Sequence, residues 1–296
     1  SKAAALVGVS ESQIHDMMHR AVRRGMERRR REESEQPLEH LSLDEKSFRK
    51  GHHYITVLGD SQRCRVLDVI EDRTASATMD LLKQSLTESQ RRTVLSVTMD
   101  MWAAFMSAKN KVLPGAVLVH DRFHVAKYLN EAIDKTRRME QRSLGSAKGA
   151  EPSLKRTRYM WLSNAEKLSP DKRELLDRLR DNDFLTAKVW AFKEAFREFY
   201  NAKDESEART FFQNWLEFAQ ELGCRHLTKV ALMLQDHLQG LLNYHAYQTT
   251  NATAEGINSQ IQRLKVNSRG FRRFENFRVA ILFFFGKLDL SPQSFS

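Results

Sequence analysis

Three acidic residues occupy positions from which their carboxylates could hold divalent metal ions. Asp44 follows the run Leu41-Ser42-Leu43, and Asp100 follows the run Val94–Met99. Both runs are short and apolar, which predicts buried strands that deliver an aspartate to the edge of a sheet. Glu255 lies in the polar stretch Asn251–Asn258, which predicts the start of a helix.

Two strand-end aspartates and a helical glutamate supply the hard oxygen ligands that a pair of Mg²⁺ ions requires, with Mn²⁺ as a substitute. In phosphoryl-transfer sites such ions stand roughly 3.5–4 Å apart, where one activates the attacking oxygen and the other stabilises the leaving oxygen. Each acid taken alone is more simply explained as a helix cap or a surface residue. The prediction of a two-metal site therefore rests on the three acids together.

The segment 34–140 shows the alternation of strands and helices that is typical of an α/β domain. Apolar runs predict strands near 41–46, 54–59, 63–70, 94–99 and 116–120, and helices near 75–88, 101–110 and 122–140. Gly51 and Gly59-Asp60-Ser61 are turn signals between the first three strands. This order fits an RNase-H-like mixed sheet, in which the first strand is central and the fourth lies beside it. Asp44 and Asp100 would then come close together.

Residues 141–248 lack strand signals and predict an all-helical insertion, which Pro152 and Ser169-Pro170 divide into pieces. Aromatic residues recur at helical spacing in Ala187–Tyr200 and again from Phe211 to Phe218. Such stripes are far more often helix core than ligand site, so we assign them to packing. Residues 249–296 return to the core domain as its second part.

The composition suits a polyanionic partner without proving one. The chain has 296 residues, with 48 Lys and Arg against 38 Asp and Glu, a net charge of +10. Cys64 and Cys224 lie far apart, so neither a disulfide framework nor a cysteine zinc site is predicted, and a reducing cytosol is expected. No run approaches the ~18 apolar residues of a membrane span, and no signal peptide is visible. Because Ser1 is not an initiator methionine, we expect further residues before it.

The N-terminal residues 1–33 have the pattern of the end of a helix-turn-helix followed by a basic linker. Gly8 would lie in the turn, and Ser10 would be the N-cap of a recognition helix that carries Gln13 and His15. A plain helical hairpin is the alternative. A run of arginines follows, which we interpret as contacts to DNA phosphates rather than as a solvated charge run. Its last members are Arg28, Arg29, Arg30 and Arg31.

A polar stripe marks the helix near the C-terminus. At ~100° per residue, Asn251, Glu255, Asn258 and Gln262 fall within an arc of roughly 60° on one helix face. Polar stripes commonly face water, but a carboxylate with amides suits a face turned toward a metal and a phosphate. Basic residues interleaved with aromatic ones follow and are suited to gripping a nucleic-acid strand. These basic residues are Arg263, Lys265, Arg269, Arg272 and Arg273.

Several blocks, in order, resemble those of the ISL-three group of DDE transposases, from bacterial insertion sequences. They are Leu43–His52, Thr98–Trp102, His120–His124, Asn251–Asn258 and Gly270–Arg278. The resemblance covers about 40–290 of the chain. It implies an RNase-H-like catalytic domain with a helical insertion before the last acid. It also implies an upstream zinc ribbon and helix-turn-helix, of which only the final part is expected here.

Matched residue by residue, the resemblance makes Asp44, Asp100 and Glu255 the catalytic, metal-binding acids. Asp121 and His124 match an Asp-x-x-His motif, which implies a further metal ligand and a phosphate-contacting histidine. A helix N-cap for Asp121 and a buried structural role for His124 are the alternatives. The resemblance also implies double-stranded DNA as the partner, both element ends and target. A homodimer in a synaptic complex is expected, in the nucleoid of the bacterial cytoplasm.

Three functions fit these observations. An active transposase would hydrolyse a strand at the element end and then use the freed 3′-hydroxyl to attack target DNA. One metal pair would serve both in-line displacements. A DNA-binding protein derived from a transposase is disfavoured because all three acids are intact. An RNase-H-like nuclease is disfavoured by the helix-turn-helix remnant and the long insertion. We therefore predict an active transposase with domains 1–33, 34–140, 141–248 and 249–296.

Overall fold

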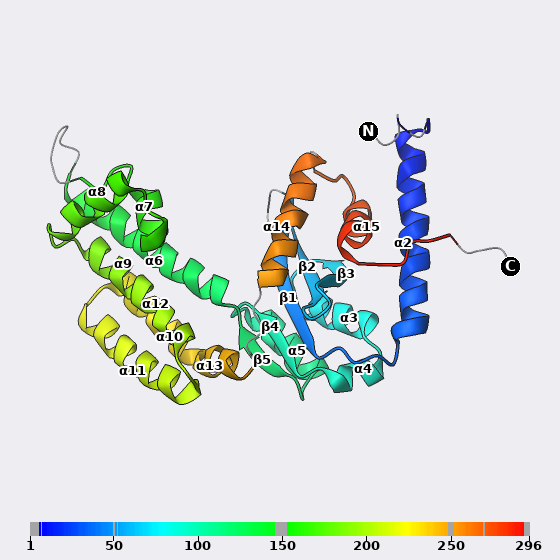
Figure 1. The fold of residues 1–296 in the computed structure, drawn as a ribbon, viewed down its shortest axis with the longest axis horizontal. Coiled ribbons are helices and arrows are strands. Elements are labelled where there is room, and N and C mark those ends of the chain that lie inside the picture. The colour runs from blue at the N-terminus through cyan, green and yellow to red at the C-terminus, as the bar shows by residue number, and fades with distance from the viewer. Residues whose placement is uncertain are drawn as a thin grey trace. The chain divides into compact units, whose positions relative to one another are not determined.

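The computed structural model describes residues 6, 8–49, 51, 53–145, 153–247, 252–268 and 270–292. The chain divides into two compact units (Figure 1). One unit combines the described residues up to Val119 with those after Thr249, and the other runs from His120 to Gln248. In the described part of the chain, no helix is both long and apolar enough to cross a membrane.

The first unit contains one mixed sheet of five strands. The strands are β1 (His40–Arg49), β2 (His53–Asp60), β3 (Arg65–Glu71), β4 (Ser96–Met99) and β5 (Val117–His120). Their order is β3-β2-β1-β4-β5. β1 pairs antiparallel with β2 and parallel with β4, and β2 pairs antiparallel with β3. The predicted mixed α/β sheet, with the first strand central and the fourth beside it, is therefore confirmed.

The helices of this unit are α2 (Glu11–Glu33), α3 (Ala75–Ser85), α4 (Glu88–Thr93), α5 (Ala103–Val112), α14 (Ala252–Asn267) and α15 (Phe274–Phe285). The helix predicted near 75–88 is α3, which ends at Ser85, and the short helix α4 that follows it was not predicted. Leu86 and Thr87 adopt extended backbone between them, and the Thr87 hydroxyl accepts a hydrogen bond from Gln90 N at 3.1 Å. The Gln90 side chain returns to Thr87 N at 3.1 Å, so a capping box starts the second helix.

Each face of the sheet has its own apolar core. Leu43 and Met99 belong to a cluster completed by α3 and α5, whereas Val57 belongs to the cluster completed by α14 and α15. Successive side chains of a strand point to opposite faces. Asp44 is paired with Val57 and so faces the α14 side of the sheet.

Two sequence predictions about β1 and β2 are corrected. β1 does not stop at Asp44 but continues to Arg49, because β2 pairs with it as far as Arg49 and His53. Gly59 lies inside β2 rather than in a turn. A Cβ at Gly59 would collide with the Ser42 hydroxyl of the neighbouring strand, so the close approach of the strands requires a glycine there.

α2 is one continuous helix that holds both the predicted recognition helix and the arginine run. Ser10 caps it as predicted, with its hydroxyl accepting from Gln13 N at 3.2 Å. Val22 and Gly25 are buried, and Gly25 packs against Leu288 in the segment after α15. α2 runs beside α15 (Figure 1). The residues that would form the preceding helix lie largely outside the described part.

In the second unit, the described residues after His120 form helices and loops. The elements are α6 (Arg122–Ser143), α7 (Arg158–Leu162), the 3₁₀ helix η1 (Ala165–Lys167), α8 (Pro170–Arg180), α9 (Leu185–Ala195), α10 (Arg197–Asn201), α11 (Glu205–Glu221), α12 (Arg225–Asp236) and α13 (Leu238–Tyr247). The predicted break at Ser169-Pro170 is present, because α8 begins at Pro170, whereas Pro152 lies outside the described residues.

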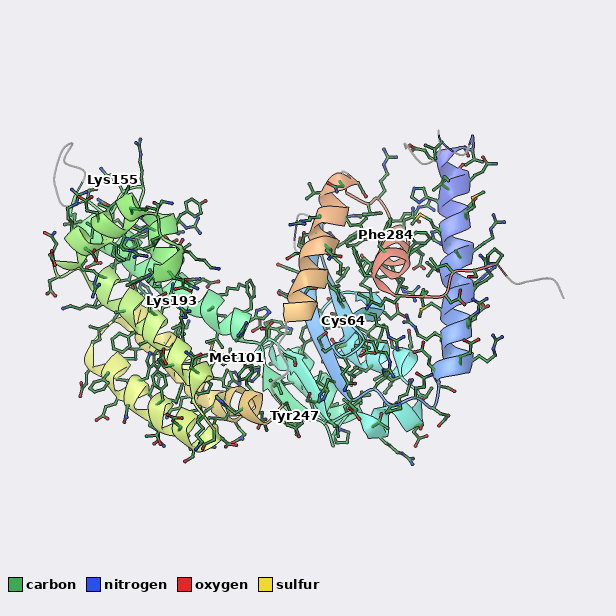
Figure 2. The ribbon with its side chains drawn as sticks, viewed as in Figure 1. Cys64, Met101, Lys155, Lys193, Tyr247 and Phe284 are labelled. Carbon is green, nitrogen blue, oxygen red and sulfur yellow. The ribbon has the colours of Figure 1, made fainter. Side chains whose placement is uncertain are left out.

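Aromatic side chains fill the core of the second unit. Phe199, Phe212 and Trp215 are buried, as the helical spacing predicted, but Phe218 is 58% exposed. Lys193 lies within this core (Figure 2), where Nζ donates to Ser163 O at 2.9 Å. Burial lowers the pKa of Lys193, which is consistent with an ammonium enclosed by helices.

Candidate active site

Asp44 is a buried carboxylate at the centre of the sheet. Its residue is 9% exposed, and Oδ1 accepts from Glu45 N at 2.7 Å. Oδ2 accepts a hydrogen bond from the Asn258 amide of α14 and lies 2.7 Å from Lys46 Nζ. The central strand and α14 therefore meet at this carboxylate.

Asp100 is the first residue after β4, the strand that neighbours β1. Ser42 pairs with Thr98, and counting two residues onward along each chain reaches Asp44 and Asp100. Parallel strands lie about 4.8 Å apart, and residues two apart share a face. This register favours neighbouring carboxylates on the α14 side. Asp100 Oδ1 accepts from the backbone N of Met101 at 2.6 Å (Met101 is labelled in Figure 2).

Glu255 lies in the first turn of α14, three residues before Asn258. Residues three apart on a helix are neighbours on one face. Because Asn258 contacts Asp44, the backbone of α14 presents the Glu255 position toward the same end of the sheet. The Glu255 side chain itself lies outside the described part of the structure, as do Asn251 and Arg269.

Two residues that the sequence did not single out contact this region. Lys46 forms an ion pair with Asp44. The only sequence feature that points to Lys46 is its position two residues after Asp44 on a strand, which places the two side chains on one face. Arg73 connects β1 just after Asp44 with the segment that follows Asp100. Its Nη1 lies 2.8 Å from Glu45 Oε2, and its guanidinium lies 4.8 Å from the ring centroid of Trp102. Nothing near Arg73 in the sequence indicates this contact.

Asp121 and His124 lie at the start of α6 in the helical unit. Asp121 is the N-cap of α6, which is the alternative role given for it in the sequence analysis, and its Oδ1 accepts a hydrogen bond from Phe123 N at 2.9 Å. His124 is 7% exposed, and its Nε2 lies 4.0 Å from Asp121 Oδ2. Burial raises the pKa of Tyr200 above its ordinary value, and the Asp121 carboxylate adds to the shift. Tyr200 is thus a further polar group beside this motif that the sequence did not indicate.

The predicted DNA-contacting residues of α2 fall into two groups. Gln13 and His15 are exposed near its start, although Gln13 Oε1 also accepts from Ser10 N at 2.8 Å. Arg30 and Arg31 are exposed as well. Arg29 instead points inward, and its guanidinium donates to Val66 O at 3.4 Å and to Gly286 O.

Arg28 also points inward, and the predicted DNA-contacting residues near the C-terminus are partly engaged by the protein itself. Arg28 donates to Ser291 O at 3.4 Å and pairs with Asp289. Burial lowers the pKa of Arg29 to about 10, and the neighbouring Arg65 guanidinium contributes. Toward the C-terminus, Lys265 Nζ donates to Ser47 O at 2.6 Å. The exposed residues there are Arg263, Arg272 and Arg273.

The chain belongs to the family described as Transposase, the ISL-three group of DDE transposases, which matches residues 41–281. It is similar to the transposase for insertion sequence element IS1001 of Bordetella parapertussis, with 28% identity over 245 residues, covering 82% of this chain and 60% of the relative. It is also similar to the transposase for insertion sequence element IS1557 of Mycobacterium tuberculosis (strain CDC 1551 / Oshkosh). That identity is 22% over 256 residues, covering 79% of this chain and 57% of the relative. The chain thus spans less than two thirds of the length of these relatives.

Proposed function

We propose that this chain cleaves DNA at the ends of an insertion sequence and joins the freed 3′-hydroxyl to target DNA. The observation that carries the proposal is the convergence at Asp44. The central strand supplies Asp44, the neighbouring strand leads directly to Asp100, and α14 carries Glu255 one turn before the Asn258 that holds Asp44. The strand order and the antiparallel pairing of the first three strands also support an RNase-H-like core.

The donor chemistry fits a divalent cation. Carboxylate oxygens are the ligands that Mg²⁺ and Mn²⁺ prefer, and Asp44 already attracts an ammonium to its Oδ2. Among the described residues, no three His, Cys, Asp or Glu side chains form a metal-binding group, and the carboxylate of Glu255 is outside that set. Asp44, Asp100 and Glu255 would hold the ions. When bound, Mg²⁺ supplies Lewis-acid stabilisation of the attacking and leaving oxygens at phosphorus.

The protein's own residues would fix the geometry of this site. The Asn258 amide orients Asp44 from the helix side, and the Glu45 backbone N holds the other oxygen. Arg73 restrains the segments that follow both aspartates through Glu45 and Trp102. Such preorganisation matters because in-line phosphoryl transfer depends chiefly on positioning and charge stabilisation.

Double-stranded DNA is the proposed substrate, and a homodimer in a synaptic complex is the proposed assembly. The family membership and the exposed basic residues on α2 and α14 support the DNA partner. We further propose that 1–33 act as the end of a DNA-binding domain, that 34–140 and 249–296 contain the catalytic core, and that 141–248 lie in the helical insertion. α6, which begins within 34–140, groups with the helical unit His120–Gln248.

The proposal is tested with a duplex that carries the terminal repeat flanking the coding region. Incubation with Mg²⁺ or Mn²⁺ should yield a nick with a 3′-hydroxyl and joining to a target plasmid, resolved on a sequencing gel. Ca²⁺ should allow binding with little turnover, because its larger and looser coordination misplaces the reacting oxygens. Specific binding with no nick in either metal would reject the catalytic proposal.

His124→Ala should lower the cleavage rate by about 10²-fold, as expected for one lost hydrogen bond to the scissile phosphate. The midpoint of thermal unfolding should change little. Asp121→Asn separates the roles, because Asn also caps a helix. Normal cleavage in Asp121→Asn would mark Asp121 as structural. Unfolding of His124→Ala, or its full activity, would contradict a phosphate contact.

Arg31→Gln and Arg29→Gln should behave differently although the arginines are two residues apart. Arg31 is exposed, so its loss should weaken binding to all DNA sequences and reduce the slope of log affinity against log salt by about one. Arg29 holds backbone carbonyls, so its loss should lower stability by about 1–3 kcal/mol. Fluorescence anisotropy across a salt series and thermal unfolding measure the two effects. An unchanged salt slope in Arg31→Gln would remove Arg31 from the interface.

A further inference from the structure

Lys46 lies two residues after Asp44 on β1, so the two side chains share a face of the sheet. Its Nζ is 2.7 Å from Asp44 Oδ2. The side chains are 20% and 12% exposed, respectively, so the pair is shielded from much of the solvent. An ion pair in such a setting is screened less than one at the surface.

Both oxygens of Asp44 are already engaged. Oδ1 accepts from Glu45 N, and Oδ2 accepts from the neutral Asn258 amide and from the Lys46 ammonium. A divalent cation on this carboxylate would stand a few ångströms from the ammonium, and the two positive charges would repel. The amide of Asn258 can remain in place, whereas the ammonium cannot without cost.

We infer that Lys46 is the cation that neutralises Asp44 before metal and DNA bind, and that its ammonium then moves to a phosphate oxygen of the bound strand. This inference rests on the proposed function of Asp44 as a metal ligand. A lysine suits both positions, because its compact charge sits on a flexible four-carbon stem with three rotatable donors. The partial exposure of Lys46 gives that stem a path toward solvent.

Such a residue couples the arrival of DNA to metal binding. A strand that draws the ammonium from Asp44 raises the affinity of the carboxylate for the divalent ion. By reciprocity, the ion raises the affinity for DNA by the same factor. Without a metal ion, the Lys46 ammonium balances the charge of Asp44. The affinity of Asp44 for a divalent ion would then be highest when DNA is bound.

The test measures Mn²⁺ affinity of the purified chain by electron paramagnetic resonance, without DNA. Lys46→Met keeps the length of the stem and removes the charge, and should bind Mn²⁺ about tenfold more tightly. Lys46→Arg retains the charge and should bind within about twofold of the unmodified chain. Lys265→Met is the matched control, because Lys265 Nζ donates to Ser47 O rather than to Asp44, and its Mn²⁺ affinity should not change.

A second measurement follows DNA binding in EDTA across a salt series. Lys46→Met should bind a duplex as the unmodified chain does. With Ca²⁺ present the unmodified chain should show a salt slope steeper by about one, which Lys46→Met lacks. This readout requires no cleavage activity.

The outcomes separate the inference from the function on which it rests. Equal or weaker Mn²⁺ binding by folded Lys46→Met, with binding abolished in Asp44→Asn, overturns the inference and leaves the proposed site intact. Mn²⁺ binding that survives Asp44→Asn overturns both. If circular dichroism shows that Lys46→Met does not fold, Lys46→Gln provides the same charge removal, and its Mn²⁺ affinity decides.

Discussion

Asp44→Asn, Asp100→Asn and Glu255→Gln should each reduce strand cleavage by on the order of 10³-fold while DNA affinity stays nearly unchanged. Each substitution keeps the shape of the side chain but removes a negative charge from the proposed metal site, where charge would have to be balanced during phosphoryl transfer. A loss of this size is the upper end of the effect of one preorganised electrostatic contact. The measurement is single-turnover cleavage of an element-end duplex, with DNA affinity taken from a mobility shift in EDTA, where no divalent ion contributes to binding.

Asp68→Asn provides a matched control for these substitutions. Asp68 is also a buried aspartate on the same sheet, but its oxygens lie 2.7 and 2.8 Å from the Arg278 guanidinium rather than facing Asn258. It should affect stability and not the chemical step once the protein is folded. Cleavage at the unmodified rate by any one of the three site variants would remove that residue from the catalytic set.

Arg65→Met should destabilise the sheet unit by about 3 kcal/mol. Arg65 Nε lies 3.1 Å from Asp60 Oδ2, and Nη2 lies 2.5 Å from Glu33 Oε2, so it joins β2 to the end of α2. The Asp60 side chain is 1% exposed and would lose a partner without gaining water. Breaking a buried pair by removing one partner costs about 3–5 kcal/mol, and the partial exposure of Glu33 favours the lower value. Urea denaturation at neutral pH measures the change.

Arg63→Met is the comparison for this stability prediction. Arg63 also pairs with Asp60, at 3.2 Å, but its side chain is 35% exposed, so its loss should cost less than about 1 kcal/mol. An equal loss of unfolding free energy in both variants would show that the burial of Arg65 does not make its ion pairs more stabilising than that of Arg63.

The dependence of this network on pH gives an independent readout. The hydrogen bond from Arg65 lowers the pKa of Glu33 below its ordinary 4.5. The stabilisation from this pair is therefore complete above pH 4.5 and is lost as the pH falls through the lower pKa of the folded state. The unmodified chain should lose this part of its stability in acid, and Arg65→Met should lack that loss.

The sequence by itself determined the family and the order of the elements in the sheet unit. Short apolar runs indicated the five strands, because a strand that is covered on both faces of its sheet is apolar at successive positions. Ser10 marked a helix start and Ser169-Pro170 marked a break between helices, since an N-cap and a proline act on the local backbone. The family also followed from short blocks of residues, and the match over 41–281 confirms it.

Only the tertiary structure decided which of these residues meet. The contacts of Asp44 with Asn258 span more than two hundred positions of sequence and depend on α14 packing against the central strand. Arg28 and Arg29 looked equivalent to Arg30 and Arg31, yet helix geometry turns the first two toward the C-terminal segment and leaves the others exposed. Periodicity predicts that a helix has faces, but it does not say which neighbour covers each face. The environment of the Lys46–Asp44 pair also depends on the tertiary structure. The strand alone places both side chains on one face, but only the packing of α14 brings Asn258 against Asp44.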